Sequence, residues 1–270
     1  MRFASYAASC VIAVCAAVVV PSDAARAQVC PVPKVMSFHV DSEITRDVRG
    51  FTQGLEWRGD RLFESTGAIA GDTRLTTIDL KGHVTVLANF AKTFFGEGLT
   101  ILHDQIYQLS WRENAVFVYD LKGKLIRRMR NPHDGWGLTN DGTNLIFTDG
   151  GDQLYFADPA TFDILRSVQV RLGKTPLDAL NELEMVDGKI YANVFTRWNI
   201  VRVEPKTGCI EAVADLHALG DRMSADEHKY LNSDSNFVLN GIAYDGQKKL
   251  FYLTGKNWRA IYVGRFADGK

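Results

Sequence analysis

The stretch Gln53-Gly54-Leu55 decides the fold, because related stretches return four more times along the chain. Each begins with a polar or aromatic residue, usually continues with Gly, and ends with Leu or Ile. The other four are Glu97-Gly98-Leu99, Trp136-Gly137-Leu138, Asn181-Glu182-Leu183 and Asn240-Gly241-Ile242. By difference of the residue numbers, successive copies are 44, 39, 45 and 59 residues apart. Periods of this size are typical of four-stranded propeller blades.

Each copy continues with the same order of elements. A second β-rich segment follows a turn that contains Gly, Asp or Asn. These segments are 62–66, 106–110, 145–149, 190–194 and 250–254. A third segment ends where an acidic residue precedes Gly or Pro, as at Asp158-Pro159, which is turn chemistry. The sequence therefore predicts an all-β fold, a five-bladed β-propeller in which equivalent residues of all copies meet around one axis.

Helical periodicity is nearly absent outside 215–230. In that segment Leu216, Leu219 and Met223 are spaced to share one helix face. This insertion accounts for the longest repeat. We expect it to form a short helix or loop over one face of the ring.

The N-terminus is typical of a secretory signal peptide. Arg2 precedes an apolar run from Ala7 to Val20, and Ala25-Arg26-Ala27 has the small-x-small pattern of a cleavage site. The run is shorter than the roughly 20 residues of a membrane span, so an uncleaved anchor is the less favoured alternative. We expect residues 1–27 to be removed, residues 28–270 to form a single propeller domain, and the protein to be periplasmic or secreted.

Charge and cysteine content limit the possible partners. The formal net charge is −1, with acidic and basic residues mixed along the chain. Such a chain has no electrostatic basis for binding nucleic acid or an anionic membrane. Cys30 and Cys209 are the cysteines that follow the predicted signal. A disulfide between them and two free thiols are both compatible with the sequence.

Aligning the copies predicts two rings of side chains. The first ring, near the axis, holds Gln53, Glu97, Trp136, Asn181 and Asn240. The second ring closes the following strand with Gly67, Trp111, Gly150, Phe195 and Gly255, and Lys256 comes next. Three Gly against two aromatic residues predict a cavity walled on one side by aromatic rings. An apolar pocket with a few polar groups is typical of a small-ligand site.

Glu97 is the candidate catalytic residue, within the stretch Phe94-Phe95-Gly96-Glu97-Gly98. A carboxylate beside aromatic rings is poorly solvated, so its pKa should rise toward the range of a general acid/base. A structural Glu that accepts backbone N–H bonds is an equally good interpretation. The amides, the Trp residues and Lys256 have structural alternatives too: water or backbone bonding, packing between blades, and a solvated surface lysine.

Other chemistries have little support in the sequence. It has no Gly-x-Ser-x-Gly elbow and no His-x-x-x-His or Cys-x-x-Cys spacing. The acidic stretch 141–152 lacks the pattern of a Ca²⁺-binding loop. We therefore expect no metal and no cofactor.

With these segments assembled, the chain resembles the plant- and bacterial-type glutaminyl-peptide cyclotransferases. The resemblance rests on 51–57, 64–67, 94–100, 108–111, 135–139, 181–184, 192–194, 239–243 and 254–258, in order over nearly the whole chain. It implies a five-bladed propeller that converts an N-terminal Gln of peptides into pyroglutamate and releases ammonia, without a metal. Peptides or proteins with N-terminal Gln are the implied partners, and we expect a monomer.

Carried over residue by residue, the resemblance implies one catalytic residue, Glu97, which acts as general base and then as general acid. The implied substrate-binding residues are Phe51, Gln53, Phe95, Trp111, Trp136, Asn181, Phe195 and Lys256. Phe195 stands where the family usually has Trp, so an N–H donor is missing there. The alternatives are a propeller that only binds, such as a periplasmic scaffold, and a metal-dependent propeller hydrolase.

Overall fold

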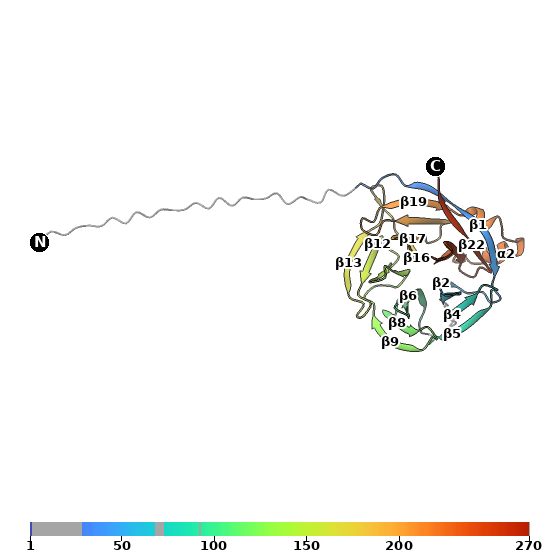
Figure 1. The fold of residues 1–270 in the computed structure, drawn as a ribbon, viewed down its shortest axis with the longest axis horizontal. Coiled ribbons are helices and arrows are strands. Elements are labelled where there is room, and N and C mark those ends of the chain that lie inside the picture. Colours follow the sequence, from blue (N-terminus) through green and yellow to red (C-terminus); the bar gives the residue numbers. More distant parts are fainter. Residues whose placement is uncertain (2–28, 68–72, 92, 270) are drawn as a thin grey trace.

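The structure is a computed structural model that describes Met1 and residues 29–67, 73–91 and 93–269. The predicted signal peptide lies outside these residues, apart from Met1. Across the described ranges the chain forms twenty-two strands and two short helices, so the all-β prediction is confirmed. The sheets are arranged in a ring around a central axis (Figure 1). No helix in the described ranges is long and apolar enough to span a membrane.

Three of the sheets have four antiparallel strands in sequence order. The first contains β2 (Thr52–Arg58), β3 (Arg61–Thr66), β4 (Arg74–Asp79) and β5 (Val84–Asn89). The second contains β6 (Gly96–Leu102), β7 (Gln105–Ser110), β8 (Ala115–Asp120) and β9 (Leu125–Arg130). The third contains β10 (Leu138–Asn140), β11 (Leu145–Phe147), β12 (Gln153–Ala157) and β13 (Ile164–Gln169). The first three strands of each sheet lie where the sequence predicts them.

The remaining two copies belong to one eight-stranded sheet, ordered β16-β17-β18-β19-β1-β22-β21-β20. Its strands are β16 (Leu180–Val186), β17 (Lys189–Val194), β18 (Asn199–Val203), β19 (Ile210–Asp215), β1 (Lys34–Thr45), β22 (Ala260–Asp268), β21 (Leu250–Gly255) and β20 (Leu239–Asp245). β1 pairs antiparallel with β22 and, at its beginning, parallel with β19. An N-terminal strand thus joins the two halves of this sheet. A short hairpin, β14 (Arg171–Leu172) and β15 (Thr175–Pro176), precedes β16.

The first strands of the copies close the ring. β2 contacts β6, β6 contacts β10, β10 contacts β16, β16 contacts β20, and β20 returns to β2. The recurring Gly permits this approach: a Cβ atom on Gly98 would lie 2.5 Å from Leu138 N, and one on Gly137 would lie 1.9 Å from Asn181 O. Each Gly is therefore required because the backbone of the next copy passes against it.

Glu182 replaces this Gly in the fourth copy and has a different role. Its side chain is fully buried and accepts hydrogen bonds from Leu55 N (3.1 Å) and Ile242 N (2.8 Å). The carboxylate thus connects β16 to β2 and β20 across the ring. Burial raises the pKa of Glu182 well above its usual range, and the two backbone bonds oppose this rise.

Apolar side chains fill the spaces between neighbouring sheets. One cluster joins Leu109 and Val118 of the second sheet to Leu138 and Phe147 of the third. The N-terminal arm is attached to this scaffold by a disulfide between Cys30 and Cys209, whose Cα atoms are 5.3 Å apart. Of the two alternatives that the sequence leaves open, the structure contains the disulfide.

The predicted insertion is present and contains two helices. They are α1 (His217–Gly220) and α2 (Ala225–Leu231), and Ser224 caps α2 by accepting from Glu227 N. The expectation of one helix face through Leu216, Leu219 and Met223 is wrong, because the helix is interrupted between Gly220 and Ala225. Leu216 and Leu219 are nevertheless buried.

Candidate active site

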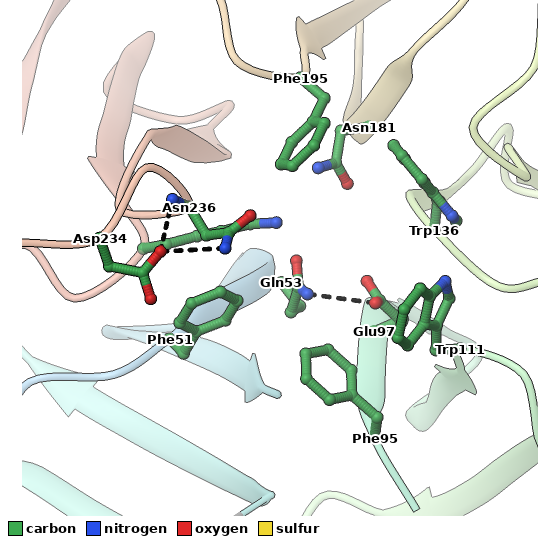
Figure 2. Close-up of a pocket in the computed structure, with 11 residues that line it drawn as sticks. Phe51, Gln53, Phe95, Glu97, Trp111, Trp136, Asn181, Phe195, Asp234 and Asn236 are labelled. Carbon is green, nitrogen blue, oxygen red and sulfur yellow. Dashed lines mark hydrogen bonds between the residues drawn. The ribbon is translucent and has the colours of Figure 1, made fainter. Parts of the chain in front are cut away.

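A cavity of about 300 Å³ opens at the end of the ring where the first strands begin. It is lined by Phe51, Gln53, Phe95, Glu97, Trp111, Trp136, Asn181, Phe195, Asp234, Asn236 and Lys256. Figure 2 shows how most of these side chains surround it. All nine residues predicted from the sequence line this cavity. Six of them lie at or just before the beginnings of β2, β6, β10 and β16, and the other three directly follow β7, β17 and β21, so ring closure brings them together.

Glu97 lies at the floor of the cavity and is only 5% exposed. Its Oε1 accepts a hydrogen bond from Gln53 Nε2 at 3.1 Å. Gln53 Oε1 in turn accepts from Asn240 Nδ2 (3.4 Å), which also donates to Thr52 O (3.0 Å). This chain of amides fixes the position of the carboxylate. Gln53 therefore positions Glu97, and one of its N–H groups is already engaged.

Glu97 and Lys256 are opposite charges in one poorly solvated space. Burial raises the pKa of Glu97 well above its usual range; the Lys256 ammonium opposes this, and Glu113 and Asp134 add to it. Burial lowers the pKa of Lys256 to about 8, against the attraction of Glu97. Lys256 Nζ lies 5.2 Å from the ring centroid of Phe51 and 4.8 Å from that of Phe195. Burial therefore disfavours the charged form of both groups.

Aromatic side chains form the walls. Phe51 and Phe95 meet edge to face with ring centroids 6.1 Å apart, and Phe95 continues to Trp111 at 5.7 Å. On the other side Trp136 and Phe195 meet edge to face at 5.5 Å. These contacts hold the rings in fixed orientations around an apolar space.

The glycines of the predicted second ring do not leave the cavity open on their side, which corrects that expectation. A Cβ on Gly67 would lie 2.2 Å from the Phe95 ring, and one on Gly150 would lie 2.5 Å from the Trp136 ring. The space that these glycines provide is filled by aromatic rings. Small residues therefore place the aromatic walls on both sides.

Comparison with known proteins identifies the family of the chain. The sequence matches the family model described as glutamine cyclotransferase over residues 10–266. The chain belongs to the glutamine cyclotransferase family. It is 36% identical over 233 residues to a glutaminyl-peptide cyclotransferase from Arabidopsis thaliana, covering 85% of this chain and 71% of the relative. It superposes on the crystal structure of glutaminyl cyclase from Myxococcus xanthus with a TM-score of 0.76 at 29% identity, covering 88% of this chain and 100% of that one.

Two lining residues of this glutamine cyclotransferase family member were missed by the sequence reasoning. Asp234 and Asn236 belong to the insertion and reach the cavity from the loop after α2. The insertion has no counterpart in the other copies, so aligning the copies gives these residues no position. The expectation that the insertion covers one face of the ring was the one sequence signal that could have indicated these two residues.

Asn181 contributes an acceptor without a partner. Its side chain lines the cavity and is 2% exposed. Within the described part of the chain, its Oδ1 atom has no hydrogen-bond partner. A buried amide oxygen of this kind is available to an N–H group of a ligand.

Within 29–67, 73–91 and 93–269, no three His, Cys, Asp or Glu side chains are grouped so that they would hold an ion. This member of the glutamine cyclotransferase family therefore has no ligand cluster among its described residues. Independence from metals stays a prediction.

Proposed function

We propose that this protein converts the N-terminal Gln of peptides into pyroglutamate and releases ammonia. The observation that carries the proposal is the buried Glu97 at the floor of an aromatic cavity, in a chain of the glutamine cyclotransferase family. The names of its relatives from Arabidopsis and Myxococcus support the same reaction. The reaction needs a base, an acid and a dry, shaped cavity, and the lining residues supply groups for all three.

In the first step Glu97 acts as the base. The α-amine of the substrate attacks Cδ of its own side-chain amide, and Glu97 takes the proton that the new N–C bond releases. Because the carboxyl pKa is raised by burial, Glu97 is a stronger proton acceptor than an exposed carboxylate. Gln53 holds Oε1 in place for this transfer. The aromatic walls keep the Gln side chain folded over its amine, which provides proximity.

In the second step Glu97 acts as the acid. The tetrahedral intermediate carries an oxyanion, and Lys256 is the one cation among the described lining residues, so we assign its stabilisation to Lys256. Glu97 then returns its proton to the departing nitrogen, the Cδ–N bond breaks, and ammonia leaves. The free Oδ1 of Asn181 accepts from the substrate amide N–H₂. Phe195 supplies an apolar wall without an N–H donor.

The first test is ammonia release from peptides that begin with Gln, with and without a chelator. We expect release that the chelator does not change, and the product should be 17 mass units lighter, the mass of ammonia. Peptides that begin with Asn or Ala are the controls. Absence of release from several Gln peptides would favour the alternative of a propeller that only binds. Loss of release with the chelator would favour a metal-dependent enzyme.

The pH dependence of the reaction rate tests the roles of Glu97 and Lys256. The rate should fall at acidic pH as Glu97 becomes protonated, and at alkaline pH as Lys256, with a pKa of about 8, loses its charge. In Lys256→Arg the cation persists, so the alkaline fall should move to higher pH. The measurement is kcat/KM against pH for both enzymes on one peptide, because the substrate amine then titrates identically in both. An unchanged alkaline limb would argue against a charged Lys256 in the reaction.

We further propose that residues 28–270 form a single domain, a propeller of five blades. The position of β1 between β19 and β22 supports the division of the eight-stranded sheet into two blades of four. We propose that residues 1–27 are a cleaved signal and that the protein acts in the periplasm or outside the cell. The Cys30–Cys209 disulfide supports an oxidising compartment. The monomeric state stays a prediction, which sedimentation would test.

A further inference from the structure

The residues that line the cavity differ in depth. Gln53, Glu97, Asn181 and Lys256 are each at most 5% exposed and form the floor. The five aromatic side chains are half-buried, whereas Asp234 and Asn236 are exposed. Figure 2 shows Asp234 across the cavity from Trp111 and Trp136. Asp234 therefore lies at the mouth of the cavity.

The loop that carries Asp234 has a defined conformation. Asp234 Oδ1 accepts from both N and Nδ2 of Asn236, at 2.9 Å each. The next residue, Phe237, meets Phe51 edge to face at 6.2 Å and stacks on Tyr230 at 5.4 Å. These contacts attach the loop to a wall of the cavity. Asp234 Oδ2 has no hydrogen-bond partner within the described part of the chain and is available to a ligand.

The helix before this loop is tied to the ring beside the floor. Arg49 donates to both carboxylate oxygens of Glu227 in α2, at 2.8 and 2.6 Å, and its guanidinium lies 4.0 Å from the ring centroid of Tyr230. Arg49 also donates to Asn257 O at 2.6 Å, next to Lys256. Arg49 therefore connects α2, which precedes the loop of Asp234, to the backbone next to Lys256.

A second cavity, of about 350 Å³, is formed beside the insertion. Residues 196–198 and parts of the insertion line it, with Arg197 and His228 among them. Asp234 lines both cavities. A peptide whose first residue fills the first cavity can therefore continue past Asp234 into the second.

We propose that Asp234 meets the second residue of the peptide substrate and favours a basic side chain there over an acidic one. This inference rests on the function proposed above. With the α-amine at Glu97, the rest of the peptide leaves by the mouth, and one extended residue spans about 3.3–3.6 Å. The second residue thus comes to the rim where Asp234 lies. Arg197 lines the second cavity but not the first, so it would meet later residues of the peptide.

The expected preference is modest because Asp234 is exposed. A solvated charge pair contributes little, and repulsion of an acidic residue adds to the attraction of a basic one, so we expect roughly a three- to tenfold difference. The difference should shrink in high salt, since such interactions are screened.

The test compares kcat/KM for three peptides that differ only in the second residue: Gln-Lys, Gln-Ala and Gln-Glu, each followed by the same neutral sequence. The order Lys, Ala, Glu is expected for the unmodified enzyme. In Asp234→Asn the ratio of Gln-Lys to Gln-Glu should approach one, and in Asp234→Lys it should invert. Asn retains an oxygen for the bonds from Asn236, so the loop geometry is preserved.

Asp163→Asn is the matched control. It removes the same charge from the turn after β12, at the end of the sheet away from the cavity, and should leave the peptide order unchanged. The salt dependence of the unmodified enzyme gives a readout that needs no variant.

The outcomes separate the two proposals. If Gln-Ala is cyclised but the three peptides react equally at low salt, Asp234 does not select the second residue. A preference for Gln-Glu would mean that the second residue meets Arg197 instead. If no Gln peptide is cyclised, the proposed function fails and this inference fails with it.

Discussion

Replacing Glu97 with Gln should lower kcat for cyclisation of a Gln peptide by about 10²- to 10⁴-fold, the usual contribution of a positioned acid/base. Gln has nearly the same shape as Glu and can still accept the hydrogen bond from Gln53 Nε2. It cannot take the proton from the amine or return one to the departing nitrogen. Ammonia release under saturating peptide measures the effect, and KM should change much less because the walls of the cavity remain.

Glu113→Gln is the matched control for this variant. Glu113 raises the pKa of Glu97 through its charge but does not line the cavity, so its loss should alter the pH profile slightly and leave kcat within a few-fold. A Glu97→Gln enzyme that keeps more than about a tenth of the rate would contradict general acid/base catalysis by this residue.

Replacing Glu64 with Ala should lower the free energy of unfolding by about 3–5 kcal/mol, because an unpaired charge would remain buried. The partner is Arg46, and both side chains are at most 1% exposed. Glu64 also accepts from Thr52 Oγ1 (2.6 Å) and Thr76 Oγ1 (3.0 Å). Urea unfolding of the purified protein gives the measurement.

The double variant Arg46→Met, Glu64→Leu distinguishes a buried charge from lost packing. Removal of both charges should recover most of the lost stability, since a buried ion pair and an apolar pair of similar volume often differ little. If Glu64→Ala alone costs less than about 1 kcal/mol, the pair is not sealed from water. Thr52 directly precedes Gln53, so this ion pair also supports the strand that positions Glu97.

The first three strands of each copy were predictable because each ends in a turn with a distinctive residue pair. The fourth strands carry no such landmark. β9, for example, reads Leu-Ile-Arg-Arg-Met-Arg and lies at an exposed sheet edge, where alternation is weak. The strand β1 completes a sheet with residues more than two hundred positions away, and nothing in its local sequence indicates that pairing.

The candidate site was more predictable than the edges of the fold. Gln53, Glu97, Trp136 and Asn181 occupy equivalent positions in the copies, and equivalence around an axis places them together. The second ring of aligned residues predicted Trp111, Phe195 and Lys256, and only Phe51 and Phe95 depended on the resemblance to a known family. The role of the glycines was misread, because only the packed structure shows that Gly67 makes room for the ring of Phe95. Asp234 was missed because the insertion occurs once.

The position of β1 in the eight-stranded sheet also has a consequence for folding. β1 pairs with β19 and with β22, two strands that lie far from it in the sequence. Contacts between distant parts of a chain close large loops, so they are expected to form late in folding. The ring and the cavity at its centre are therefore expected to be completed together, when β1 reaches these two strands.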